Sequence, residues 1–220
     1  MPTTRLWENN IYFERAFDEF VDFLAHSTMP PAEIRAVLDG IEEANARVHG
    51  YGSVNFGRNL RQCYEKLAER VVADDDLQVV MRFAERILDQ PVEIIDGVPD
   101  TLAYLAERHE LTLFTKGSRE EQKLKIDRSG LAEFFAHVAI VREKNAPAYR
   151  TLVEERAMAI ERSWMIGNSP KSDVNPALEA GLNAVFVPHA HTWVLEKEEI
   201  RAGKGRLLTV ERFTGLRSHF

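Results

Sequence analysis

Apolar positions in the first part of the chain recur with the period of a helix. Throughout residues 8 to 90 they fall three or four residues apart, which is the spacing of the buried face of an amphipathic helix. We therefore predict four helices that form a small bundle around one apolar core. Their apolar positions are, helix by helix, Phe13, Phe17, Phe20 and Leu24; Ile34, Val37, Leu38 and Ile41; Leu60, Cys63, Leu67 and Val71; and Leu77, Val80, Met81, Ala84, Ile87 and Leu88.

From residue 91 the pattern changes to short apolar runs that alternate with helical stretches. Runs of this kind are typical of buried parallel strands joined by helical crossovers. The prediction is an α/β fold with a mostly parallel sheet covered by helices on both faces. The runs cover residues 111 to 115, 137 to 141, 163 to 167 and 183 to 187, and the helical stretches lie near residues 98 to 108, 118 to 129, 146 to 159 and 172 to 181.

Composition narrows the class of protein without changing this picture. The 220 residues are 45% apolar, and 28 basic against 35 acidic residues give a net charge of -7. Such a chain lacks the basic surface that nucleic acids and anionic membranes attract. It has no apolar run of the roughly 18 residues needed for a membrane helix, and its amino terminus lacks a signal-peptide layout. We expect a cytoplasmic protein with a small-molecule ligand, and without a nucleic-acid or membrane partner.

Polar residues follow the first two predicted strands. The first strand ends in Thr115, Lys116 and Gly117, and Ser118 begins the next helix. One interpretation is an anion-binding site, built from a hydroxyl, backbone N–H groups and a helix amino terminus. The other is a plain strand-to-helix turn, which needs the same glycine and the same cap. Lys144 follows the second strand and either neutralises a bound anion or is solvated.

Asn168 and Asp173 follow the third predicted strand, five residues apart around a turn. Their amide and carboxylate oxygens are ligands that Mg²⁺ accepts while it keeps several waters. Alone, Asp173 also fits a helix cap. Because the ends of parallel strands meet at one edge of a sheet, we expect all these groups to converge there. A phosphate-plus-Mg²⁺ site has this composition.

In their order and spacing these residues closely resemble the motifs of the haloacid dehalogenase-like hydrolase superfamily, over nearly the whole chain. Its second motif, a Thr or Ser that ends a strand, matches Thr115, and its third, a Lys before a helix, matches Lys144. Its fourth, an acidic or amide ligand followed by an Asp, matches Asn168 and Asp173. The similarity is greatest to Mg²⁺-dependent phosphatases that carry a helical C1 cap after their first strand.

The resemblance implies a three-layer, Rossmann-like core of residues 91 to 220 with residues 1 to 7, and an inserted all-helical cap of residues 8 to 90. It also implies that a small phosphorylated metabolite is hydrolysed through an aspartyl-phosphate intermediate under a closing cap. The Mg²⁺-type fourth motif favours phosphate over a haloacid as substrate. The residues that the resemblance assigns are Thr115, Lys116, Gly117 and Lys144 for phosphate, and Asn168 and Asp173 for Mg²⁺.

The family's first motif is missing. In the family a strand ends in Asp-x-Asp-x-Thr, and the two aspartates act as nucleophile and as acid/base. Counting back from Leu6 places Met1, Thr3 and Arg5 at the nucleophile, the acid/base and the threonine. A thioether and a hydroxyl cannot do these jobs, so we expect the chain as written to be inactive.

The strand that carries this motif is the central one in the superfamily, between the strands that end at Thr115 and Gly167. We expect its absence to leave two inner edges unpaired, at about 1–3 kcal/mol for each unsatisfied backbone group. Several such losses are large against a total stability of roughly 5–15 kcal/mol. The chain is therefore expected to fold only if another segment fills the slot or the gap closes.

Two explanations for the missing motif stay open. One is a shift of reading frame, because DNA that encodes Asp-Ala-Asp-Asp-Thr reads, one base later, as Met-Pro-Thr-Thr-Arg, which are residues 1 to 5. The other is a pseudoenzyme that serves as a phosphate-binding or interaction module. Elsewhere we expect His189 and His191 in a surface loop and Cys63 as a small apolar residue of the bundle.

Overall fold

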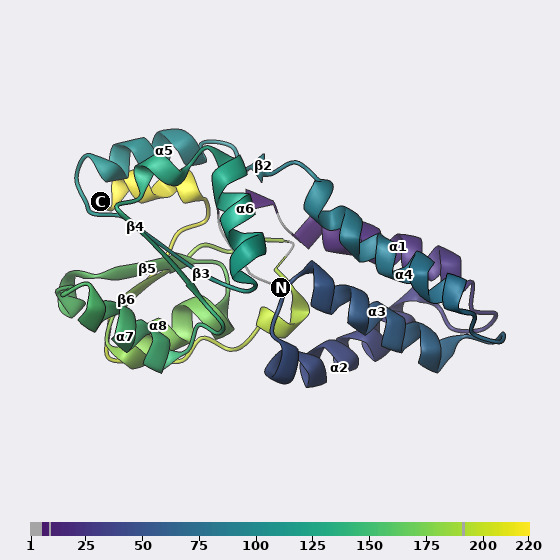
Figure 1. Cartoon of the computed structure of the whole chain (residues 1–220). Coiled ribbons are helices and arrows are strands. Elements are labelled where there is room, and N and C mark those ends of the chain that lie inside the picture. Colours follow the sequence, from purple (N-terminus) through teal and green to yellow (C-terminus); the bar gives the residue numbers. More distant parts are fainter. Residues whose placement is uncertain (1–5, 9, 191) are drawn as a thin grey trace. The chain divides into compact units, whose positions relative to one another are not determined.

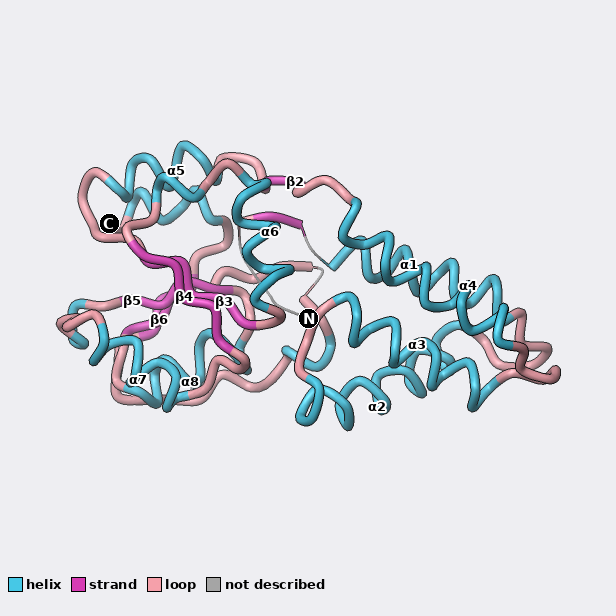
Figure 2. Tube along the Cα trace, viewed as in Figure 1, coloured by secondary structure: helices cyan, strands magenta, loops and turns pink. Residues whose placement is uncertain are grey.

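The computed structural model of the chain describes residues 6–8, 10–190 and 192–220. It divides into two compact units, one of which is Asn10–Pro91 and the other Val92–Phe220 together with the residues that precede Asn10. The first unit is helical and the sheets belong to the second (Figures 1 and 2). Within the described residues, no helix has the length and apolar character that crossing a lipid bilayer requires.

The helical unit contains the four helices that the apolar periodicity predicts. They are α1 (Asn10–Leu24), α2 (Pro31–His49), α3 (Ser53–Leu67) and α4 (Asp74–Glu85), and a 3-10 turn (Arg86–Asp89) follows α4. Each helix buries the side of its surface on which the apolar positions fall. The side chains with no exposure at all include Phe13, Phe20, Leu38, Leu60, Cys63 and Val80.

One position expected on the third helix is wrong. Val71 lies beyond the end of α3 at Leu67 and is 91% exposed. The chain leaves the helix at Ala68, and the carboxylate of the next residue, Glu69, accepts hydrogen bonds from the backbone N–H and the hydroxyl of Ser27. The contact with the turn after α1 thus ends the helix one turn earlier than the apolar spacing indicates.

The second unit contains the four predicted strands, each within one residue of its expected bounds. These are β3 (Thr112–Lys116), β4 (His137–Val141), β5 (Trp164–Gly167) and β6 (Asn183–Phe186). β4 pairs with β3, and β6 pairs with β5, all in parallel. Three short strands were not predicted: β7 (Leu207–Thr209), parallel to β6, and β1 (Trp7–Glu8), antiparallel to β2 (Glu93–Ile94).

Helices cover both faces of these strands, as the α/β prediction requires. They are α5 (Val98–Ala106), α6 (Arg119–Ser129), α7 (Ala146–Glu155) and α8 (Asn175–Ala180), and a π-helical turn, η4 (Pro170–Val174), precedes α8. α7 ends four residues before its expected end. Short 3-10 helices complete the unit: Ala132–Phe134, Ile160–Arg162, Val194–Glu196 and Phe213–Ser218.

Two apolar clusters give the unit its three layers. One cluster joins α5 and the 3-10 helix Phe213–Ser218 to Leu113 of β3 and Val185 of β6. The other joins α7 and α8 to Phe114 of β3, on the opposite face because neighbouring residues of a strand point to opposite sides. The three-layer, Rossmann-like architecture is confirmed.

The strands form two separate parallel sheets instead of one. Their orders are β3–β4 and β5–β6–β7, and among the described residues no strand pairs with the other side of β3 or of β5. A cavity of about 560 Å³ is lined by residues of both β3 and β5. The gap expected in place of the central strand therefore exists, and the neighbouring strands do not close it.

Candidate functional site

Thr115 lies near the carboxyl end of β3 in a fully buried position. Its Oγ1 donates a hydrogen bond to Oε1 of Gln122 in α6, at 3.0 Å. Ser118 caps α6, because its Oγ accepts from the backbone N–H of Glu121 at 3.4 Å. The expected cap is present, and the Thr115 hydroxyl sits at the carboxyl end of the strand with a protein acceptor already beside it.

Gly117 sits where the chain turns away from β3. Its φ of 131° is in the region that favours glycine. Its backbone N–H donates to the carbonyl oxygen of Val141, the last residue of β4, at 3.0 Å. The N–H group that the resemblance assigns to phosphate is thus engaged in the β3–β4 pairing.

Lys116 is buried, with its side chain only 1% exposed. Its Nζ lies 2.9 Å from Oε1 of Glu143, 2.8 Å from Oγ of Ser172 and 2.8 Å from Oε1 of Glu196. An ammonium group has three N–H donors, and three acceptors surround this one. Lys116 therefore links the end of β3 to the segments that follow β4, β5 and β6, and we leave it out of the phosphate-binding set proposed below.

Lys144 and Asp173 form a second buried ion pair, between Nζ and Oδ1, with both side chains 1% exposed. Lys144 precedes α7, whose cap is Asn145. The other carboxylate oxygen of Asp173 accepts from the backbone N–H of Ser169 at 2.9 Å. The structure thus brings together two residues that the sequence places after different strands, in the two different sheets.

Gly167, the last residue of β5, lies directly against the Asp173 carboxylate. A Cβ at this position would overlap the carboxylate carbon and oxygen of Asp173. Any other residue would displace Asp173 from Lys144. The glycine is therefore required by this close approach.

Asn168 has a buried side-chain amide in which the nitrogen has a hydrogen-bond partner and the oxygen has none among the described residues. Its Nδ2 donates to Oγ1 of Thr192 at 2.9 Å, while Oδ1 is buried and has no hydrogen-bond partner in the described part of the chain. Buried side-chain oxygens without a partner are rare and call for an explanation, such as an ion or a water molecule.

The donors at this edge fit Mg²⁺, which usually takes one or two carboxylates and keeps several waters. An amide oxygen without a partner and the Asp173 carboxylate belong to one short segment. Residues 6–8, 10–190 and 192–220 hold no group of three or more His, Cys, Asp or Glu side chains arranged for a metal. A largely hydrated Mg²⁺ does not require such a group, because it takes most of its ligands from water.

Glu196 is the main residue of this edge that sequence reasoning missed. Oε1 contacts Lys116 and Oε2 accepts from the hydroxyl of Ser169. Burial raises the pKa of Glu196, but the charge and hydrogen bond of Lys116 and the Ser169 hydroxyl outweigh it, so the pKa lies below its ordinary value of 4.5. No spacing in the sequence connects Glu196 to Lys116, which lies 80 residues earlier.

Tyr149 was missed as well. It is fully buried on α7, and its hydroxyl donates to the carbonyl oxygen of Ser172 at 2.9 Å. Burial raises the pKa of Tyr149 well above its ordinary value. The hydroxyl therefore stays a donor and fastens the turn that carries Asp173 to α7.

The remaining expectations have mixed outcomes. His189 is not a plain surface residue, because its Nε2 lies 3.0 Å from Oε1 of Glu8 and its side chain is only 18% exposed. Cys63 is fully buried in α3, as expected, and burial raises the pKa of its thiol to about 12. The expectations for Met1, Thr3, Arg5 and His191 lie outside the described residues.

Comparison with known proteins identifies the family to which the chain is similar. Residues 51–187 match the family described as haloacid dehalogenase-like hydrolase. The crystal structure of a hydrolase of this family from Xanthomonas campestris superposes with a TM-score of 0.84 at 28% identity, over 97% of this chain and 85% of that one. No curated protein matches significantly.

Two more distant crystal structures share the fold. A haloacid dehalogenase-like (HAD) hydrolase from Bacillus subtilis, bound to magnesium, matches with a TM-score of 0.69 at 15% identity, over 98% of this chain and 93% of that one. A 2-haloacid dehalogenase from Pseudomonas syringae matches with a TM-score of 0.61 at 17% identity, over 97% of this chain and 93% of that one.

Proposed function

Because the chain belongs to the haloacid dehalogenase-like hydrolase family, we propose that its sheet edge is a Mg²⁺-dependent site for the phosphate monoester of a small metabolite. The observation that carries the proposal is the buried Lys144–Asp173 pair together with Asn168, five residues before Asp173 in the chain, whose buried Oδ1 has no hydrogen-bond partner among the described residues. A positive group for the phosphate and two oxygen ligands for the cation are thereby held on neighbouring loops.

The charges of the edge support a cation as part of the site. Two ammonium groups, Lys116 and Lys144, face three carboxylates, Glu143, Asp173 and Glu196. With all five ionised the sum is +2 − 3 = −1, which attracts a cation and repels a free dianion. When bound, Mg²⁺ would offset phosphate charge and polarise the phosphorus–oxygen bonds.

Lys144 has the donors that a phosphate needs. Within the described residues its ammonium donates only to Asp173, so two of its three N–H groups are available for phosphate oxygens. Asp173 fixes the direction of the ammonium, and the Thr115 hydroxyl reaches a second phosphate oxygen by rotating away from Gln122. These residues bind and orient the ester in a buried setting, where charge–charge interactions are strong.

Hydrolysis needs a carboxylate nucleophile in addition, and residues 1 to 7 contain none. The chain as written therefore binds phosphate and Mg²⁺ without turnover. In a full enzyme of this type, an aspartate at the position of Met1 attacks phosphorus, and a second one at the position of Thr3 transfers the proton.

Binding is tested by calorimetric titration of inorganic phosphate, with and without Mg²⁺. We expect phosphate to bind only when Mg²⁺ is present, and Lys144→Met to weaken binding at least tenfold. The matched control is Lys171→Met, because Lys171 is an exposed lysine three residues from Asn168. Equal binding by both variants would show that Lys144 does not hold the phosphate. Circular dichroism of each variant verifies that it is folded.

Turnover is tested with p-nitrophenyl phosphate. The chain as written is compared with a version that carries an apolar strand before residue 1 and the changes Met1→Asp, Thr3→Asp and Arg5→Thr. Hydrolysis only by the restored version supports a phosphatase. A restored version that folds and stays inert instead supports a binding module without enzymatic activity.

A further inference from the structure

The chain that follows β6 contacts three consecutive residues that begin at the end of β5. Each of the three has a hydrogen-bond partner in residues 187–190 or 192–196. The pairs are Gly167 with Val187, Asn168 with Thr192, and Ser169 with Glu196. The amide of Asn168, whose oxygen the proposed function assigns to Mg²⁺, is therefore held by a residue 24 positions later in the chain.

The hydroxyl of Thr192 can play only one part toward Asn168. Its Oγ1 lies 3.0 Å from the carbonyl oxygen of His189 and 2.9 Å from Nδ2 of Asn168. A hydroxyl has one hydrogen to donate and two lone pairs that accept, whereas a carbonyl oxygen only accepts. The hydroxyl hydrogen must therefore point to His189. Toward Asn168 the hydroxyl has only a lone pair to offer.

This restriction determines which end of the Asn168 amide faces Thr192. The oxygen and nitrogen ends of an amide have nearly the same shape, and hydrogen bonds decide which way each of them points. Because Thr192 accepts, the nitrogen end must face it. The oxygen end then points the other way, where Oδ1 is buried without a hydrogen-bond partner among the described residues. Mg²⁺ binds oxygen ligands, so this orientation is the one that a cation site needs.

Thr192 is itself held in place before any cation binds. Its backbone N–H donates to the same carbonyl oxygen of His189, at 3.2 Å. The ring of His189 lies 3.0 Å from Oε1 of Glu8 in β1. Thr192 is only 8% exposed and Asn168 only 5%. A ligand whose direction is fixed in advance loses little conformational entropy on binding.

We propose that Thr192 is a positioning residue of the cation site: its hydroxyl holds the amide nitrogen of Asn168, so that the amide oxygen faces Mg²⁺. This inference rests on the proposed function, which assigns Asn168 to Mg²⁺. Groups that hold a ligand from behind commonly fix its orientation, and their removal typically lowers metal affinity about 10- to 100-fold.

A purely structural role for the Thr192 hydroxyl makes a different prediction. In that case the hydroxyl would only stabilise the turn that begins at His189. The substitution Asn168→Asp separates the two roles, because a carboxylate presents an oxygen in either orientation and needs no donor held behind it. Positioning by Thr192 then becomes unnecessary, whereas a structural contribution remains.

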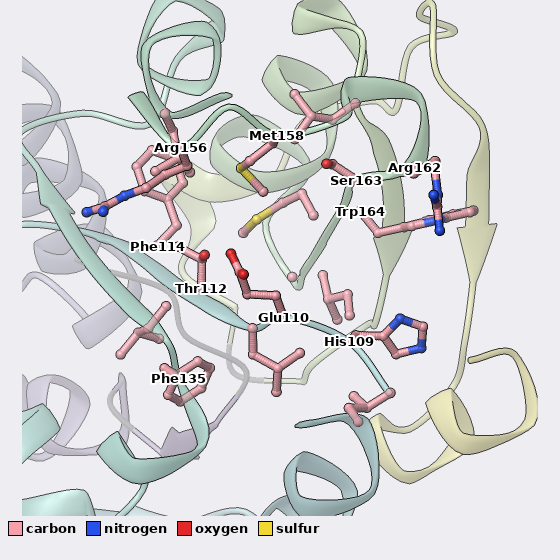
Figure 3. A pocket seen from close by; sticks show the side chains of 18 of the residues that line it. His109, Glu110, Thr112, Phe114, Phe135, Arg156, Met158, Arg162, Ser163 and Trp164 are labelled. Atoms are coloured by element: carbon pink, nitrogen blue, oxygen red, sulfur yellow. The ribbon is translucent and has the colours of Figure 1, made fainter. Parts of the chain in front are cut away.

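Thr192→Val is the variant that removes the hydroxyl with little change of size. The carbonyl oxygen of His189 keeps the backbone N–H of residue 192 as a donor. The cavity of about 560 Å³ shown in Figure 3 also keeps its wall, because neither Asn168 nor Thr192 belongs to the described residues that line it. The matched control is Thr151→Val, the same substitution at an exposed position of α7.

Calorimetric titration of the full chain with MgCl₂ tests the proposal. We expect Thr192→Val to weaken Mg²⁺ binding at least about tenfold. Thr192→Ser, which keeps the hydroxyl, and the control Thr151→Val should bind like the parent chain. In a chain that carries Asn168→Asp, adding Thr192→Val should change the affinity by less than about twofold, because the two positions are then no longer coupled. Circular dichroism verifies that each variant is folded.

Nitrogen-15 NMR of the side-chain amide measures its orientation in the absence of Mg²⁺. The signals of Asn168 are identified by their loss in Asn168→Asp. A hydrogen bonded to a fixed acceptor is protected from exchange with solvent, so we expect exchange at Nδ2 to be at least about tenfold faster in Thr192→Val than in the parent chain. Thr192→Ser should exchange like the parent.

Three results overturn the proposal. One is Mg²⁺ binding by Thr192→Val that equals binding by the parent chain. Another is an equal loss of affinity with and without Asn168→Asp, which would assign the hydroxyl a structural role alone. The last is amide exchange that Thr192→Val leaves unchanged. A parent chain that binds no Mg²⁺ overturns the proposed function instead, whereas the amide exchange alone decides whether Thr192 orients Asn168.

Discussion

Lys116 and Glu196 form an ion pair with 2.8 Å between Nζ and Oε1, although 80 residues separate them and each side chain is only 1% exposed. Lys116 ends β3 and Glu196 belongs to the segment that follows β6, so the pair connects the two separate sheets. With the Lys144–Asp173 pair it holds the carboxyl ends of the strands together across the gap.

Removing the charge of Glu196 should destabilise the protein. Glu196→Gln leaves the buried ammonium of Lys116 with a weaker partner, and breaking a buried pair in this way costs about 3–5 kcal/mol. Urea denaturation at pH 7 measures the change. Glu199→Gln is the control, because Glu199 is exposed and such surface changes usually stay within about 0.5 kcal/mol. Equal losses in the two variants would contradict a structural role for the pair.

The stability that Glu196 contributes should depend on pH. Its pKa in the folded protein lies below the ordinary value of 4.5, so the folded state releases the proton more readily than the unfolded state. The contribution is then fully present above about pH 4.5 and is lost as the pH falls through the folded-state pKa. The difference between the parent chain and Glu196→Gln should therefore shrink between pH 5 and pH 3. A difference that stays constant over this range would refute the assignment.

Gly167→Ala should disturb the Lys144–Asp173 pair. The new Cβ would overlap the Asp173 carboxylate, and overpacking of this kind costs about 1–3 kcal/mol. Phosphate binding in the presence of Mg²⁺ should weaken with it. Gly40→Ala is the same substitution inside α2, where nothing lies within contact of the added methyl, and it should stabilise the protein by up to about 1 kcal/mol. Urea denaturation measures the stability of the two variants, and calorimetric titration measures their phosphate binding. Unchanged phosphate binding by Gly167→Ala would count against the proposed site.

Glu42→Gln should stabilise the helical unit at neutral and higher pH. Burial raises the pKa of Glu42 to about 7 from 4.5, and its Oε2 has no hydrogen-bond partner among the described residues. The ionised form is therefore penalised above about pH 7, by up to about 3 kcal/mol at 1.36 kcal/mol per pH unit between the two pKa values. Below pH 4.5 both states are protonated and the penalty vanishes.

Thermal unfolding from pH 4 to pH 8 measures this effect. The gain from Glu42→Gln should grow as the pH rises, whereas Glu43→Gln, at the exposed neighbouring position, should show no such trend. A gain of equal size at pH 4 and pH 8 would mean that shape rather than charge is responsible.

Part of the candidate site was predictable because its residues follow strands that the sequence itself marks. Thr115 ends one apolar run, and Lys144, Asn168 and Asp173 follow two others. Parallel strands bring such positions to one edge. The partners of these residues were not predictable. Glu196 is distant in sequence from Lys116 and belongs to no apolar pattern. Whether the N–H of Gly117 has an acceptor depends on where β4 ends, since the carbonyl oxygen of Val141 accepts from it.

The sequence alone determined the four helices of the first unit, the four main strands of the second and the order of the groups at the sheet edge. These features depend on periodicity, caps and turns, which act between residues close together in the chain. Only the tertiary structure decided that β3 and β5 remain apart around a cavity and that Lys116 is enclosed by three acceptors. Pairing and charge neutralisation depend on distances in space between segments far apart in sequence, which a pattern of apolar and polar residues does not encode.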